Sequence, residues 1–219
     1  DNVDKENKII IKSPILSGDV NKITIKIDEQ DIRDSKDSVI GIFDPEENGF
    51  NLNMWKGSDG ENIKNILKRI NNLNLSNFSE NLLFTVLFTN AYPPKNNLTS
   101  SEFLKMKIKW LIKNERFDDL EVLLKKNPEV GKNPNAIKSL INEYLSSADI
   151  KSACEKISFL DKDVQNNYLD KFTVYCLINN DQINEAQMVL ELLKEKGLKD
   201  KFFENKINFL MGMAETTSQ

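Results

Sequence analysis

The chain of 219 residues contains no histidine, which removes the commonest general base and the commonest metal ligand in proteins. It has only two cysteines, and Cys154 has no second cysteine at the spacing of a thioredoxin-like motif. Long apolar runs are also missing. The longest, such as Leu82–Phe88, fall well short of the roughly 20 residues that a bilayer-crossing helix needs. We therefore predict a protein without imidazole chemistry, redox-motif chemistry or membrane insertion.

The sequence shows no concentrated basic stretch, because lysines and carboxylates are intermixed along the predicted helices of a chain of net charge -4. Nucleic acids and anionic membranes favour a concentrated basic face, so we predict that neither is the main partner. Gly57, Gly60 and Lys64 lack the Gly-Lys-Ser/Thr ending of a phosphate-binding loop. The acidic runs at residues 28–34 and 118–121 indicate a solvated turn and a helix start rather than metal sites. The sequence predicts no enzyme activity, no cofactor and no metal.

Apolar residues at helical spacing dominate what is present. Asn179–Gly197 has an apolar stripe, a candidate N-cap at Asp181 and a glycine stop. The same pattern occurs earlier, at Asn114–Lys126 and Ser147–Ile157, with a period of about 33 residues typical of tetratricopeptide-like arrays. Apolar or small residues recur in this register: Phe117, Ile150 and Ile183; Leu120, Ala153 and Ala186; Ile108, Ile141 and Val174.

This pattern predicts a mainly α fold, an α-solenoid of stacked antiparallel helix pairs, over residues 50–213. For residues 1–49 the sequence predicts an extended N-terminal arm. Three short strand-like segments that end in turn residues indicate this: Ile9–Lys12, Val20–Ile27 and Val39–Phe43. The alternative for this arm is a partly disordered leader. Residues 214–219 are polar and predict a frayed tail or a linker.

The two cysteines fall on neighbouring predicted helices. Their distances from the turns at the helix ends, measured along the helix axes, differ by only ~4 to 5 Å, given the rise of an α-helix. A disulfide between Cys154 and Cys176 is geometrically allowed. The alternative is that both are small buried hydrophobic residues, and the compartment decides between the two. The spacing alone leaves this choice open.

Trp110 departs from the register, because Glu143 and Cys176 stand at the equivalent positions of the later units. Tryptophan is enriched among residues that anchor protein partners, so Trp110 is a candidate partner-binding residue. The alternative is a core position next to Phe88 or Tyr92.

Three segments carry a resemblance to a known family: LNMWKGSDG with the later NAYPP, SADIKSACEKI, and VYCLINNDQINEAQMVLELLKEKGLKDKFFENKINFLMG. Over about Phe50–Gly212 the chain resembles an uncharacterised family of secreted helical proteins from alphaproteobacteria. That family has a Trp-Lys/Arg-Gly motif before the first helix and cysteines at the positions of Cys154 and Cys176. The resemblance implies an exported, periplasmic protein with a Cys154–Cys176 disulfide and a chain that continues beyond Gln219. Free thiols would instead favour the cytoplasm.

Together these observations predict a non-catalytic helical-repeat scaffold that presents a curved surface to another protein or peptide. The main alternative is a regulatory or substrate-binding domain of a larger exported enzyme. A third hypothesis is a small-molecule binder with a pocket between the N-terminal arm and the helices.

Overall fold

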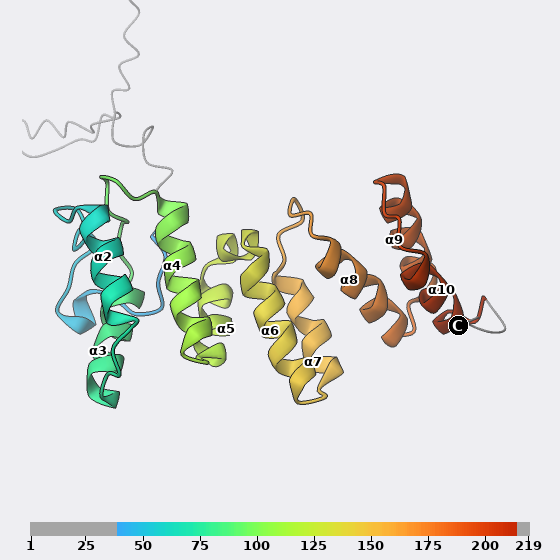
Figure 1. Ribbon diagram of the computed structural model, residues 1–219, viewed down its shortest axis with the longest axis horizontal. Helices are drawn as coiled ribbons and strands as arrows, with labels where there is room; N and C mark the ends of the chain where they lie inside the picture. Colours follow the sequence, from blue (N-terminus) through green and yellow to red (C-terminus); the bar gives the residue numbers. More distant parts are fainter. Residues whose placement is uncertain (1–38, 214–219) are drawn as a thin grey trace, which may run out of the picture. The chain divides into compact units, whose positions relative to one another are not determined.

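The computed structural model describes residues 39–213, and over this range the chain is mainly helical, as the sequence predicted (Figure 1). The α-helices are α2 (Gly60–Ile70), α3 (Asn77–Phe88), α4 (Ser100–Lys113), α5 (Phe117–Lys126), α6 (Pro134–Ser146), α7 (Ile150–Glu155), α8 (Asn167–Asn179), α9 (Ile183–Glu195) and α10 (Lys201–Leu210). Short 3-10 helices η1 (Glu46–Asn48), η2 (Pro128–Lys132) and η3 (Lys156–Phe159) join them. The expected strands Ile9–Lys12 and Val20–Ile27 and the tail 214–219 lie outside the described residues.

Local sequence explains where most helices begin. An N-terminal turn leaves backbone amides without partners, and an oxygen-bearing side chain just before the helix can accept their hydrogen bonds. Thr99 does this for α4 and forms a reciprocal capping box with Glu102. The other side-chain caps are Asp59 for α2, Ser76 for α3, Asn133 for α6, Asp149 for α7, Asn166 for α8 and Asp200 for α10.

Three helix pairs, α4–α5, α6–α7 and α8–α9, are each joined by a turn of the same kind. Each turn contains a non-glycine residue in the left-handed conformation: Glu115 at φ 54°, Ala148 at φ 58° and Asp181 at φ 59°. These positions are 33 residues apart (115, 148, 181). The predicted N-cap role of Asp181 is therefore wrong, since this residue forms the turn and Gln182 precedes α9 without a side-chain cap.

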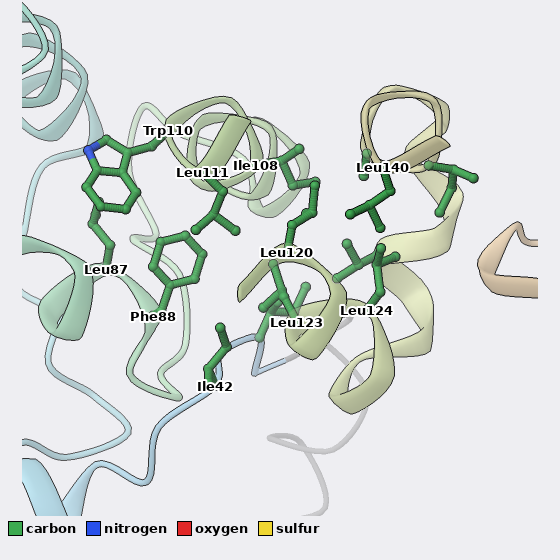
Figure 2. Packing of buried hydrophobic residues seen from close by; sticks show 14 of the residues in the cluster. Ile42, Leu87, Phe88, Ile108, Trp110, Leu111, Leu120, Leu123, Leu124 and Leu140 are labelled. Carbon is green, nitrogen blue, oxygen red and sulfur yellow. The ribbon is translucent and has the colours of Figure 1, made fainter. Parts of the chain in front are cut away.

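Buried apolar side chains form two clusters. The larger one extends from Ile40 to Leu169, and Figure 2 shows part of it, with Phe88 near Leu111 and Leu120 near Leu123. The smaller one consists of Val174, Ala186, Leu190 and Ile207. The boundary between the two clusters falls within α8.

Burial follows the 33-residue register in both clusters. The fractional exposure is at most 2% at Ile108, Ile141 and Val174 and is 0% at Leu120, Ala153 and Ala186. The residues that begin the return helices differ more, since Ile150 is 36% exposed whereas Phe117 and Ile183 are partly buried.

The segment Val39–Phe43, here called the strap, packs into the larger cluster through Ile40 and Ile42. Its four consecutive carbonyl oxygens accept hydrogen bonds: Ile40 from Lys107 Nζ (2.9 Å), Gly41 from Asn127 Nδ2 (2.8 Å), Ile42 from Lys126 Nζ (2.7 Å) and Phe43 from the Asn90 amide (2.9 Å). A Cβ atom on Gly41 would lie 2.6 Å from the Phe88 carbonyl oxygen, so only glycine fits. The strap forms one isolated β-bridge, Phe43 with Thr89, in place of the predicted strand.

Lys107 is the least expected member of this core. Lys107 is only 3% exposed, and its amine lies 4.8 Å from the centre of the Phe103 ring. Among residues 39–213 no carboxylate pairs with it. Burial away from water disfavours the charged amine and lowers the pKa of Lys107 from 10.5 to about 7.

The low pKa of Lys107 predicts an unusual dependence of stability on pH. Between pH 7 and 10.5 the unfolded chain binds a proton at this amine that the folded chain releases, so stability rises with pH over this window. We expect the free energy of unfolding of the parent to rise by about 2 kcal/mol from pH 7 to 9 relative to Lys107→Met. Urea titrations at several pH values measure this, and parallel curves for the two proteins would refute it.

Candidate binding groove between α2 and α4

Helices α2 and α4 run in the same direction, and hydrogen bonds join them at both ends. Near the start of α2, Lys64 Nζ donates to the Asn97 carbonyl, 2.9 Å away, just before α4 begins. At the other end, Lys113 Nζ donates to the Asn71 carbonyl just after α2. A groove of about 410 Å³ lies between these two contacts. This volume is within the range of known ligand sites.

Four lysines line the walls of this groove, and no aspartate or glutamate does. Lys64 and Lys68 come from α2, and Lys109 and Lys113 from α4. Lys64 lies 4.0 Å from Glu61 and 3.8 Å from Glu102, pairs that solvent weakens because the carboxylates are half exposed or more.

Two of the four lysines have no counter-charge in the part of the chain that the structure describes. Among residues 39–213, Lys68 and Lys109 form no ion pair and no side-chain hydrogen bond. The groove is thus a positively charged site in a chain of net negative charge.

The floor of the groove is apolar. Leu67, Met106 and Trp110 line it, with fractional exposures of 7% for Leu67 and 4% for Trp110. The Trp110 ring stacks on Phe84 with ring centres 6.0 Å apart. It also lies near Phe88 (Figure 2), and the centres of these two rings are 6.0 Å apart. Trp110 therefore occupies the core position beside Phe88 that was its alternative assignment, and it is nearly buried where it lines the groove.

A second hollow, of about 920 Å³, adjoins the strap. Asp44 and Glu46 line it together with Lys126, two carboxylates and one amine. The Lys126 amine already donates to the Ile42 carbonyl. Its charged side chains therefore leave one net negative charge, with the amine already engaged, and they form no series along a helix like the lysines of the groove between α2 and α4.

Among the described residues, the carboxyl group with the largest pKa shift lies elsewhere, where α5, α6 and η3 meet. The Glu121 carboxylate accepts hydrogen bonds from Lys125 (2.7 Å), Lys156 (2.9 Å) and the Tyr144 hydroxyl (3.0 Å). Burial alone would raise the pKa of Glu121, but these three donors outweigh it and lower that pKa to about 2. Glu121 stays ionised at neutral pH and joins three segments, which is a structural role.

Cys154 on α7 and Cys176 on α8 have their sulfur atoms 2.08 Å apart, at disulfide distance, with Cα atoms 5.4 Å apart. This agrees with the disulfide that the resemblance implied, and intramolecular disulfides are typical of oxidising compartments. Within residues 39–213 no helix is long and apolar enough to span a bilayer. In the same range no group of three or more His, Cys, Asp or Glu side chains is placed to hold a metal ion.

No family model, curated protein or solved structure matches the chain. Membership of the alphaproteobacterial family stays a prediction. Sequence reasoning did not find the groove, although a signal existed: Lys64 and Lys68, and likewise Lys109 and Lys113, are four residues apart and so share a helix face. Lysine is abundant throughout this chain, and only the packing of α2 beside α4 distinguishes these four.

Proposed function

We propose that the chain is a non-catalytic helical-repeat scaffold that binds another protein or peptide, in the periplasm after export. The observation that carries this proposal is the open groove between α2 and α4, which combines charged walls with an apolar floor. Protein-binding surfaces commonly combine an apolar centre with a polar rim. No nucleophile–base pair or metal cluster lies in the groove, so binding is the function that its side chains can support.

The scaffold part of the proposal is supported by the three similar turns at a 33-residue step. Three helix pairs of the same local geometry, with buried positions in the same register, are expected of repeated units that stack on one another. Such stacks present extended surfaces, and the step from this architecture to partner binding is an analogy. The periplasmic part is supported by the cysteine pair at disulfide distance.

Site-specific photo-crosslinking in the host cell tests this function. A photoreactive amino acid at position 109, in the groove, should yield a discrete crosslinked product with one partner protein. The control is the same amino acid at position 151, an exposed lysine on α7 outside the groove. Products at neither position, or the same products at both, would contradict partner binding through the groove.

A further inference from the structure

The groove between α2 and α4 also indicates what kind of segment it binds. We propose that it takes an extended, acidic protein segment with carboxylates at alternate positions. This inference rests on the proposed function and names the chemistry of the partner at the same site.

The charge of the groove gives the first argument. Four lysines and no aspartate or glutamate line a space of about 410 Å³, and Lys68 and Lys109 have no counter-charge within the described chain. Clefts lined by one sign of charge concentrate field lines and attract ligands of the opposite sign. An anionic segment would neutralise these lysines, whereas a neutral or basic one would leave them facing each other.

The spacing of the lysines gives the second argument. On each wall the two lysines are four residues apart along a helix, which places them about 6 Å apart along the axis. In an extended segment, side chains on the same side are two residues apart and about 6.7 Å apart along the chain. Carboxylates at alternate positions, all on the side of the segment that enters the groove, can therefore meet both lysines of a wall, while the intervening side chains point out of the groove.

The same geometry fits other anions poorly. A single phosphate group is a point charge, whereas these lysines come from two helices and are four residues apart on each. A nucleic acid carries charge along its whole length and would meet the net negative surface of the chain outside the groove. The apolar floor of Leu67, Met106 and Trp110 favours a segment that also has aliphatic groups.

Fluorescence polarisation with the full-length chain and three labelled peptides tests this proposal. The first peptide alternates glutamate with alanine, the second replaces each glutamate by glutamine, and the third keeps the number of glutamates but separates them by four residues. We expect the first to bind most tightly and to lose affinity as salt rises. Equal binding of the first and second peptides, or of the first and third, would overturn the proposal.

A charge-reversal pair localises the binding. Lys68→Glu with Lys109→Glu should weaken the alternating peptide at least about tenfold, because the pair adds repulsion as well as removing attraction. The matched control is Lys151→Glu with Lys162→Glu, which changes the net charge equally at exposed sites outside the groove and should change affinity less than about twofold. Thermal melts verify that both variants fold. Equal weakening by both pairs would contradict binding in the groove.

Partner binding in the groove and the acidic chemistry of the partner can be contradicted separately. A crosslink at position 109 without binding of the alternating peptide would leave a protein-binding groove and reject an acidic partner. Tighter binding of inorganic phosphate or of a DNA duplex, abolished by Lys68→Glu with Lys109→Glu, would also reject the acidic segment. No crosslink and no peptide binding would remove both proposals.

Discussion

Replacing Glu121 with glutamine should lower the free energy of unfolding at pH 7 by about 3 kcal/mol, the typical cost of breaking a buried ion pair from one side. The Glu121 side chain is 13% exposed and that of Lys156 is 10% exposed, with 2.9 Å between their charged atoms. Without Glu121, the Lys156 ammonium is left nearly buried beside the Tyr144 ring, 4.7 Å away, with no counter-charge. Glu143→Gln, at an exposed position on the same helix as Tyr144, is the control and should cost little.

The Glu121 substitution should also change how stability depends on pH. The pKa of Glu121 is lowered to about 2 from its usual 4.5, so its stabilising contribution is complete above pH 4.5. As pH falls from 4.5 to 2 the folded chain must take up this proton, and about 3 kcal/mol of stability is lost. Denaturant titrations of Glu121→Gln should lack this loss. An unchanged acid profile in Glu121→Gln would show that other carboxyl groups dominate acid unfolding.

Removing the cysteine pair should have the second largest effect. The two cysteines are 22 residues apart in sequence, and closing a loop of this length in the unfolded chain is worth about 3 kcal/mol in the chain-entropy account. We therefore expect Cys154→Ser with Cys176→Ser to lower the free energy of unfolding by that order. Mass measurement with and without alkylation of the parent establishes the redox state first.

The position of the pair predicts where this loss appears. The cysteines join α7 to α8, and the boundary between the two apolar clusters falls within α8. Hydrogen exchange in the double serine variant should therefore accelerate in α8–α10 before it changes in α4–α6. A reductant should reproduce the effect in the parent and leave the variant unchanged. Uniform acceleration along the chain would mean that both clusters unfold as one unit.

The helices could be predicted from the sequence because caps, apolar stripes and stops agree in most of them. Thr99 with Glu102 and the glycine stop at Gly197 are local signals that need no tertiary partner. Asp181 misled because the same side chain that suits an N-cap also tolerates the left-handed conformation that the turn requires. Whether Asp181 caps α9 or forms the turn depends on where the preceding helix ends.

The strap and the groove could not be predicted, because both depend on segments that are distant in sequence. Ile40 and Ile42 alternate like a strand, yet the groups that bind their carbonyl oxygens are Lys107 and Lys126, which are far along the chain. The four groove lysines likewise come from two helices separated by α3. The environment of Trp110 also depends on distant segments. As a tryptophan it was a candidate partner-binding residue, and the neighbouring Phe84 and Phe88 rings place it in the core.

Helix α8 places Leu169 in one apolar cluster and Val174 in the other. This one helix therefore transmits mechanical load between the two apolar clusters. Tension applied on the C-terminal side would reach the rest of the chain through α8 and the Cys154–Cys176 pair rather than through a broad apolar contact. Such tension would therefore load α8 and the Cys154–Cys176 pair before it reached the groove between α2 and α4.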